Sequence, residues 1–231
     1  MSSFILKIIA CICMFLDHYS DTIIGKFTFL NLIGRIAFPI FAYQTVQSYK
    51  HSKNIKKHLI KLFLFFLISE IPFRLFISTF SSSQSINVLM TFILAIISLI
   101  IFDKTKNKKI GFLFVIIISI INELIKADYG WFGILLVFNF YYFECIYRDK
   151  NKKLIMLLIA FLLCNLKYIP NMITNPNYIN MYFYCGIFTS LSLVFISLYN
   201  SKEGHKLKYF FYIFYPLHLT VLYIIHNILL K

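Results

Sequence analysis

Asp17 and His18 are adjacent and lie inside the first long apolar stretch of the sequence, residues 4–24. A run of about 20 apolar residues can cross a bilayer as a helix. An Asp near the centre of such a helix costs roughly 2.5–3.5 kcal/mol on insertion scales. We therefore expect the pair to face a protein interior or a wet cavity, where an imidazole can act as a base near neutral pH. A packing hydrogen bond between helices, or a position near the wet interface, is the alternative.

Neither residue can be the other's partner, because neighbours in a helix point about 100° apart. Arg35 follows in the next stretch at a similar depth, so it can meet His18, and His218 of the last stretch is the nearest expected partner of Asp17. The structural alternative is a packing ion pair between Asp17 and Arg35. The other polar candidates in the apolar stretches are Glu70, which can pair with Arg74 four residues later, Asn87, Thr91 and Tyr215, and Asp128 and Tyr129 lie in the connection between the fifth and sixth stretches.

The composition is that of an integral membrane protein. Hydrophobic residues make up 60% of the chain and charged residues 14%, and the mean hydropathy is +0.78. Soluble domains are nearer to about 45–50% apolar. The expected fold class is therefore all-α, a polytopic helical bundle that forms a single transmembrane domain over residues 1–231. The five cysteines lie in apolar stretches at spacings that fit no zinc site, so no metal is expected.

Hydropathy and charge together predict the topology. Nine apolar stretches are candidate spans, at residues 4–24, 28–49, 58–79, 86–102, 110–126, 130–147, 154–170, 179–199 and 209–230. Their connections alternate between a basic kind, at residues 50–61, 104–109, 148–153 and 202–208, and a short polar kind, at residues 25–27, 81–85, 127–129 and 171–178. Because basic connections stay in the cytoplasm, we expect a cytoplasmic N-terminus and an external C-terminus.

The same pattern explains the net charge of +14 without a nucleic-acid partner, since the basic residues cluster between spans. Attraction of an anionic ligand or a lipid headgroup to these connections is the functional alternative. In the predicted topology Asp17, His18 and Arg35 lie in the outer half of the membrane, and His218 lies nearer the middle. We therefore expect a polar pocket that opens outward.

Six short motifs occur in order from the first expected span to the last. They are residues 6–10 with 16–18, residues 33–42, residues 68–73, Asn87 with Thr91, residues 128–133 and residues 211–219. Together they resemble the TraX family. One departure is Arg74, which stands directly after Phe73 where the family usually has an acidic residue, so any role of that acidic position is in doubt here.

The resemblance implies acyl transfer in a bacterial inner membrane. The family is associated with acetylation of a pilin subunit and looks like a distant relative of enzymes that use cytoplasmic acetyl-CoA. The expected reaction moves an acetyl group from acetyl-CoA, the donor substrate, to an amine or hydroxyl of a membrane-presented peptide, glycan or lipid. A proton-coupled transporter with an outer-half polar cavity, or a purely structural membrane protein, is the alternative.

The chemistry assigns a role to each candidate residue. His18 is the expected base or transient acetyl carrier, and Asp17 and His218 complete the catalytic group. Arg35, Tyr215 or Asn87 could donate to the oxyanion that develops during acyl transfer. The residues expected to bind substrate or cofactor are Arg35, Glu70, Asn87, Thr91, Asp128, Tyr129 and Tyr215.

Reporter fusions test the predicted topology. A reporter that is active only in the cytoplasm should be active after Lys57, Lys109, Lys153 and Lys208. It should be inactive after Ser83 and Asn175, because these residues lie in short polar connections. A cytoplasmic C-terminus would contradict the count of nine spans.

Overall fold

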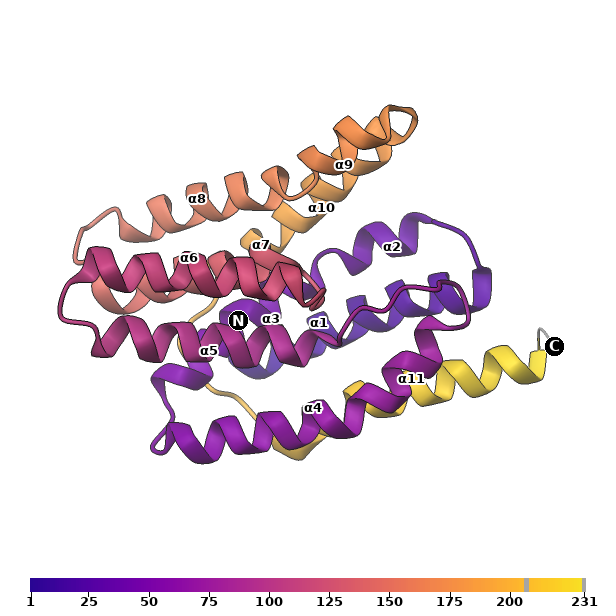
Figure 1. Cartoon of the computed structure of the whole chain (residues 1–231), viewed down its shortest axis with the longest axis horizontal. Coiled ribbons are helices and arrows are strands. Elements are labelled where there is room, and N and C mark those ends of the chain that lie inside the picture. The colour runs from indigo at the N-terminus through magenta and orange to yellow at the C-terminus, as the bar shows by residue number, and fades with distance from the viewer. Residues whose placement is uncertain (206–207, 230–231) are drawn as a thin grey trace. The chain divides into compact units, whose positions relative to one another are not determined.

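A computed structural model describes residues 1–205 and 208–229, and most of them are helical (Figure 1). The only β-structure within these residues is an isolated bridge between Ile86 and Ala127. The predicted all-α class is confirmed. The basic connection at 202–208 and the last apolar stretch at 209–230 are described only in part, because residues 206–207 and 230 lie outside the described residues.

The long helices follow the apolar stretches of the sequence. They are α1 (Ser3–Tyr19), α3 (Ala37–Lys50), α4 (Ile55–Ile77), α5 (Val88–Lys104), α6 (Lys108–Leu124), α7 (Gly130–Tyr141), α8 (Lys152–Leu166), α10 (Ile179–Ser197) and α11 (Lys208–Leu229). The short helices are α2 (Phe29–Gly34), α9 (Ile169–Thr174), the π-helical turns η1 (Ser20–Ile24) and η2 (Tyr142–Ile146), and the 3₁₀ turn η3 (Pro176–Tyr178).

Five described helical segments are long and apolar enough to cross a membrane: Ser3–Ile24, Phe29–Lys50, Lys152–Thr174, Pro176–Ser197 and Phe210–Ile228. They correspond to the first, second, seventh, eighth and ninth predicted stretches. Helices α5 and α6 have 17 residues each, about 26 Å at the rise of an α-helix, which is short of a hydrocarbon core of about 30 Å. The chain is thus a multi-pass membrane protein, and the number of nine spans stays a prediction.

The second predicted span is interrupted in its middle. Helix α2 ends at Gly34 and α3 begins at Ala37, so Arg35 and Ile36 lie between two helices. Pro39 explains the position of this break, because it has no N–H for the carbonyl of Arg35 and its ring would clash with that carbonyl in a continuous helix. The break therefore lies one turn before Pro39, at Arg35.

The helices divide into two compact units. Unit 1 contains residues 1–41, 68–83 and 164–231, and unit 2 contains residues 42–67 and 84–163. The division runs through helices α3, α4 and α8. A single transmembrane domain over the whole chain stays a prediction.

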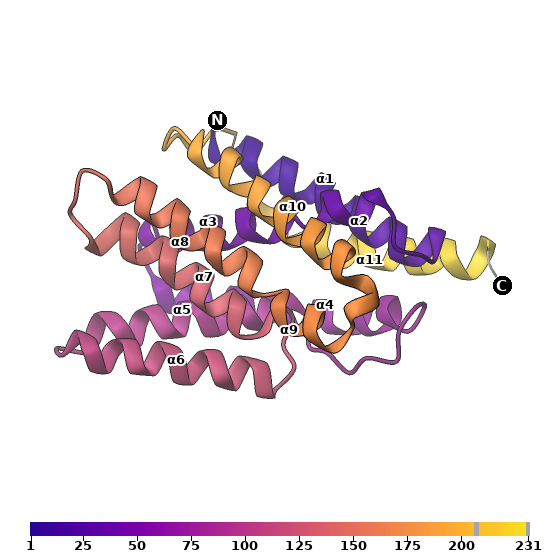
Figure 2. The same ribbon diagram turned by 90° about the horizontal axis from the view of Figure 1, so that it is seen from above.

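Within unit 1, α1 and α11 pack together and run in the same direction (Figure 2). Phe4 contacts Phe211 near the start of both helices, with ring centroids 6.3 Å apart. Near their ends, His226 Nδ1 donates to the carbonyl of Thr22 at 2.8 Å. The N-terminus also pairs with the connection before α11, since the Met1 ammonium donates to the Leu198 carbonyl at 2.5 Å. The charge pattern likewise predicts that these two segments share one side of the membrane.

Candidate functional site

Two histidines that are 200 positions apart in the sequence meet in unit 1. His18 of α1 and His218 of α11 place Nδ1 and Nε2, respectively, 2.9 Å apart. Their rings are nearly parallel, with planes at 3° and centroids 5.1 Å apart. The face of α1 that carries His18 therefore packs against α11.

One backbone carbonyl determines which ring nitrogens carry protons. His218 Nδ1 lies 2.7 Å from the carbonyl oxygen of Phe214, and a carbonyl can only accept, so His218 Nδ1 donates. In a neutral imidazole the other nitrogen has a free lone pair, so His218 Nε2 accepts from His18 Nδ1. A neutral His18 then keeps its own lone pair on Nε2. The carbonyl of Phe214 thus orients His18 Nε2 as a base.

Aromatic rings line the histidine pair. The Phe76 ring lies 4.7 Å from the ring of His18, and the Phe214 ring stacks on His218 at 4.7 Å with planes at 13°. Tyr215 contributes a third ring, 5.8 Å from His218. His218 is only 5% exposed. An apolar surrounding of this kind favours neutral imidazoles.

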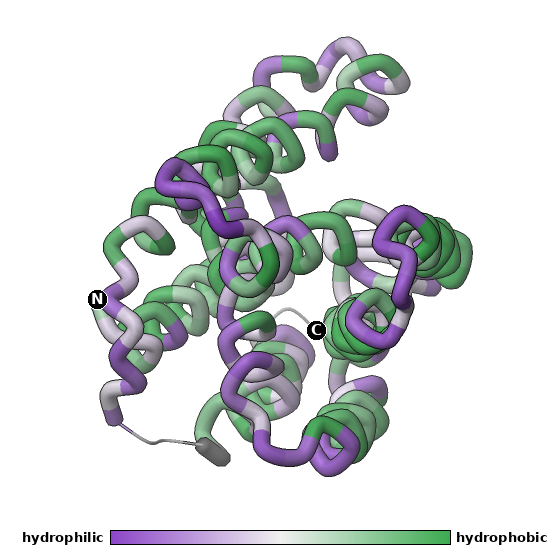
Figure 3. The backbone as a smooth tube through the Cα atoms, turned by 90° about the vertical axis from the view of Figure 1, so that its left-hand side faces the viewer, coloured by the Kyte–Doolittle hydropathy of each residue, from purple (hydrophilic) through white to green (hydrophobic). Residues whose placement is uncertain are grey.

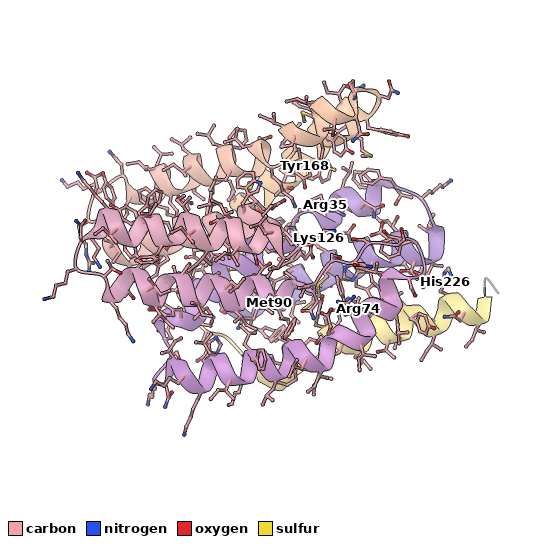
Figure 4. All side chains as sticks on the ribbon, viewed as in Figure 1. Arg35, Arg74, Met90, Lys126, Tyr168 and His226 are labelled. Carbon is pink, nitrogen blue, oxygen red and sulfur yellow. The ribbon has the colours of Figure 1, made fainter. Side chains whose placement is uncertain are left out.

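Asp17 faces a different helix from His18. Its carboxylate accepts two hydrogen bonds from Arg35 Nη2, at 2.6 and 2.8 Å, and is buried at 7% exposure. Arg35, labelled in Figure 4, also donates from Nε to the carbonyl of Asn31 at 3.1 Å. A buried carboxylate without such a partner would be strongly destabilising, so the ion pair accounts for the presence of an Asp at this depth.

Asn31 is a site residue that the sequence analysis missed. It is fully buried, and its Nδ2 donates to Asp17 Oδ1 at 2.9 Å and to Asp21 Oδ1 at 2.7 Å. Its Oδ1 accepts from Ser20 Oγ and from the backbone N–H of Thr28. The available signal was its place three residues after Thr28, which is the spacing of a capping box at the start of α2.

Gly34 allows α1 and α2 to approach closely at this cluster. A Cβ on Gly34 would lie 2.3 Å from Asp17 Cβ and 2.4 Å from Asp17 Cγ. No side chain larger than hydrogen fits there without a shift of one helix. Asn31 and Gly34 of α2, with Arg35 directly after it, therefore form a socket that holds Asp17.

The expected partners of Asp17 and His18 are exchanged in the structure. His218 bonds His18 rather than Asp17, and Asp17 forms the ion pair with Arg35 that was the structural alternative. The reason is the direction of each face of α1. The short connection after η1 returns α2 to the Asp17 face, whereas α11 packs on the face about 100° away that carries His18. The ion pair expected between Glu70 and Arg74 is present at 2.9 Å.

Asn87, Thr91, Asp128 and Tyr129 all belong to unit 2, where they hold one connection in place. Asn87 caps α5 by accepting from the N–H of Leu89 at 3.0 Å. Thr91 Oγ1 donates to the Asp128 carbonyl and accepts from Asn122 Nδ2. Asp128 Oδ1 accepts from the N–H of Tyr129, whose φ of 66° lies in the left-handed region. These contacts fix the turn before α7, and the binding roles expected for these residues stay predictions.

No three His, Cys, Asp or Glu side chains among the described residues converge as metal ligands would. Two adjacent residues of α1 instead belong to two polar clusters. Asp17 lies in the ion-pair socket, and His18 forms the histidine pair with His218. Acid–base chemistry on a proton is what such an arrangement can perform.

Comparison with known proteins gives the family. The TraX protein model matches residues 2–226, which is nearly the whole chain. The chain belongs to the TraX family. A relative, the probable fimbrial assembly protein FimC (serogroup H1) of Dichelobacter nodosus, is 28% identical over 238 residues, covering 96% of this chain and 94% of its own length. No solved structure matches the chain. TraX membership therefore rests on the sequence along almost its full length.

Gly34→Ala tests the socket in this TraX-family chain. We expect a loss of about 1–3 kcal/mol in the free energy of unfolding, because an added methyl overlaps Asp17. Denaturation of the purified parent and variant in detergent measures this difference in the free energy of unfolding. Gly25→Ala is the control, since its Cβ meets nothing within 4 Å and only its left-handed backbone, with φ at 69°, adds a cost. Parent-like stability of Gly34→Ala would contradict the socket.

Proposed function

We propose that this chain is a membrane-embedded acyltransferase that moves an acetyl group from cytoplasmic acetyl-CoA to an amine or hydroxyl presented at the membrane. The observation that carries the proposal is the orientation of His18. Its Nδ1 is engaged by His218, which the Phe214 carbonyl holds in turn, and its Nε2 keeps a lone pair beside aromatic walls. A neutral, oriented imidazole in a dry surrounding is the group that activates an amine or hydroxyl for attack on a thioester.

The transfer follows from this orientation. His18 Nε2 removes the proton from the acceptor while the amine nitrogen or hydroxyl oxygen of the acceptor attacks the carbonyl carbon of the thioester. The C–S bond breaks when the tetrahedral intermediate collapses, and the proton on Nε2 passes to the departing thiolate of CoA. His218 stabilises the imidazolium that forms, because its Nε2 accepts from the proton on His18 Nδ1. In the covalent alternative, Nε2 itself attacks the thioester and carries the acetyl group to the acceptor.

A cation on α1 supports a thioester donor that carries phosphates. Lys7 and His18 are 11 residues apart, so they lie about 20° apart around the helix and about 17 Å apart along it. Both face α11, since Lys7 Nζ lies 5.4 Å from the centroid of the Phe211 ring. The same face therefore presents a positive charge near the N-terminus and a base three turns further on. A long donor with anionic groups at one end and a reactive carbonyl at the other fits this spacing.

The relative supports a peptide acceptor. The D. nodosus protein is described as a probable fimbrial assembly protein, and it matches this chain along almost its whole length. The subunit of a surface fibre is a peptide presented at the membrane, which is one of the acceptor classes that the chemistry allows. The acceptor proposed for this protein is accordingly the amine or hydroxyl of a peptide presented at the membrane.

His18→Ala should abolish acetyl transfer from labelled acetyl-CoA to membrane acceptors. Its free energy of unfolding should fall by about 1–3 kcal/mol, because the buried His218 Nε2 loses its donor, and the variant should still fold. His51→Ala is the matched control, because it removes an exposed imidazole from the connection after α3. Full transfer by His18→Ala would remove this residue from the chemistry. If His18→Ala keeps acetyl transfer but loses a proton or solute flux across the membrane, the result would favour a proton-coupled transporter.

Lys7→Gln should raise the KM for acetyl-CoA and leave kcat almost unchanged, because Lys7 is three turns from the reacting nitrogen. Loss of one charge-assisted contact is worth about 1.5–3 kcal/mol, so the expected rise is about tenfold or more. Lys26→Gln, which removes an exposed cation from the connection after α1, should change neither constant. Lys7→Arg should restore most of the affinity. An equal effect of Lys7→Gln and Lys26→Gln would show that Lys7 serves only topology.

A further inference from the structure

The three basic connections of unit 2 gather at one of its ends. They are residues 50–61, 104–109 and 148–153, and Figures 1 and 2 show them at the same end of the unit. Together they contain thirteen Lys and Arg residues and one acidic residue, Asp149. Figure 3 shows the hydrophilic colour of these connections toward the viewer. All of the thirteen cations except Lys152 are exposed, so this end presents a dense positive surface.

The two acidic residues that flank the connections accept hydrogen bonds from tyrosine hydroxyls. Asp103 accepts from the hydroxyl of Tyr49 at 2.7 Å and also from the hydroxyl of Tyr141. Glu144 accepts from the hydroxyl of Tyr43 at 2.9 Å. Lys50 Nζ lies 3.7 Å from the other oxygen of Glu144. These bonds tie α3, α5 and α7 together, and they direct the flanking carboxylates toward tyrosines.

Each basic connection leads directly into a helix with exposed aliphatic side chains. Ile60 is 59% exposed one residue before Lys61, Leu113 is 56% exposed one turn after Lys109, and Leu154 is 58% exposed next to Lys153. A ligand that touches both kinds of surface must carry an anionic head beside an apolar tail. A soluble phosphate compound would use the cations and leave the aliphatic side chains uncovered.

We infer that this end of unit 2, defined by residues 50–61, 104–109 and 148–153, is a binding surface for anionic phospholipid headgroups. The phosphates contact the exposed lysines, and the acyl chains cover the aliphatic side chains that follow them. Lys50 and Lys108 are partly engaged, since Lys50 Nζ lies near Glu144 and Lys108 Nζ donates to the Phe102 carbonyl at 2.9 Å, so exposed lysines such as Lys57 and Lys106 carry the attraction. The inference does not depend on acyl transfer, because it concerns surface charge and not His18.

Lipid selection by the full chain tests the surface. The protein is placed in nanodiscs that contain equal amounts of phosphatidylglycerol and phosphatidylcholine, and the lipids that remain bound are identified by native mass spectrometry. Each basic residue near an anionic surface contributes about a fivefold preference. Lys57→Gln with Lys106→Gln should therefore lower the enrichment of phosphatidylglycerol by up to about 25-fold. Lys26→Gln with Lys126→Gln is the matched control. It removes two exposed lysines outside these connections and should leave the enrichment of phosphatidylglycerol unchanged.

Three outcomes would overturn the inference. The parent could retain both lipids equally, or both double variants could lose phosphatidylglycerol to the same extent. Alternatively, millimolar CoA could displace phosphatidylglycerol from the parent, which would assign the surface to a soluble phosphate compound. The comparison of the two lipids uses the parent alone, so the test holds even where a variant fails to fold. Enrichment in the parent should also disappear near 1 M salt, where charges are screened within about 3 Å.

Discussion

The ion pair between Asp17 and Arg35 is the constraint on which unit 1 depends. A carboxylate inside an apolar helix must find a cation and hydrogen-bond donors, and α2 supplies both through Arg35 and Asn31. That requirement explains the short connection after α1 and the glycine at position 34. Each of these features brings the backbone of α2 close enough to reach a short side chain on α1. The socket thereby fixes the rotation of α1 about its own axis.

Fixing the rotation of α1 also fixes where His18 points. Asp17 and His18 are neighbours, so holding the first toward α2 turns the second toward α11, where His218 meets it. One residue of the pair is held by an ion pair with Arg35, and the other forms a hydrogen bond with His218. This division explains why two costly side chains stand next to each other in a membrane helix. A substitution in the socket would therefore change the direction of the His18 imidazole.

The sequence predicted the class of the fold and the Glu70–Arg74 pair, but it expected His218 to meet Asp17 and gave the Asp17–Arg35 ion pair only as the alternative. Long apolar runs and basic connections are local signals, so the all-α membrane class and the candidate residues could be read directly. Whether Arg35 meets Asp17 or His18 depends on which face of α1 each neighbouring helix covers, and that is a tertiary property. Asn31 was missed for the same reason, since a lone Asn near a helix start resembles an ordinary cap. Asn87, Thr91, Asp128 and Tyr129 were grouped with the histidines as polar residues of the sequence motifs, which does not tell unit 1 from unit 2.

The π-helical turn η1 has a consequence for how this chain tolerates changes in length. The N–H of Gly25 bonds the carbonyl of Ser20, five residues back, so the turn holds about one residue more than an α-helical turn. It is equivalent to a single-residue insertion confined to one turn. Residues after it can shift register while Asp17 and His18, which precede it, keep their directions. A deletion of one residue between Ser20 and Ile24 could tighten the turn to ordinary α geometry, whereas a deletion before Asp17 would rotate the N-terminal half of α1, including Lys7, away from its present face.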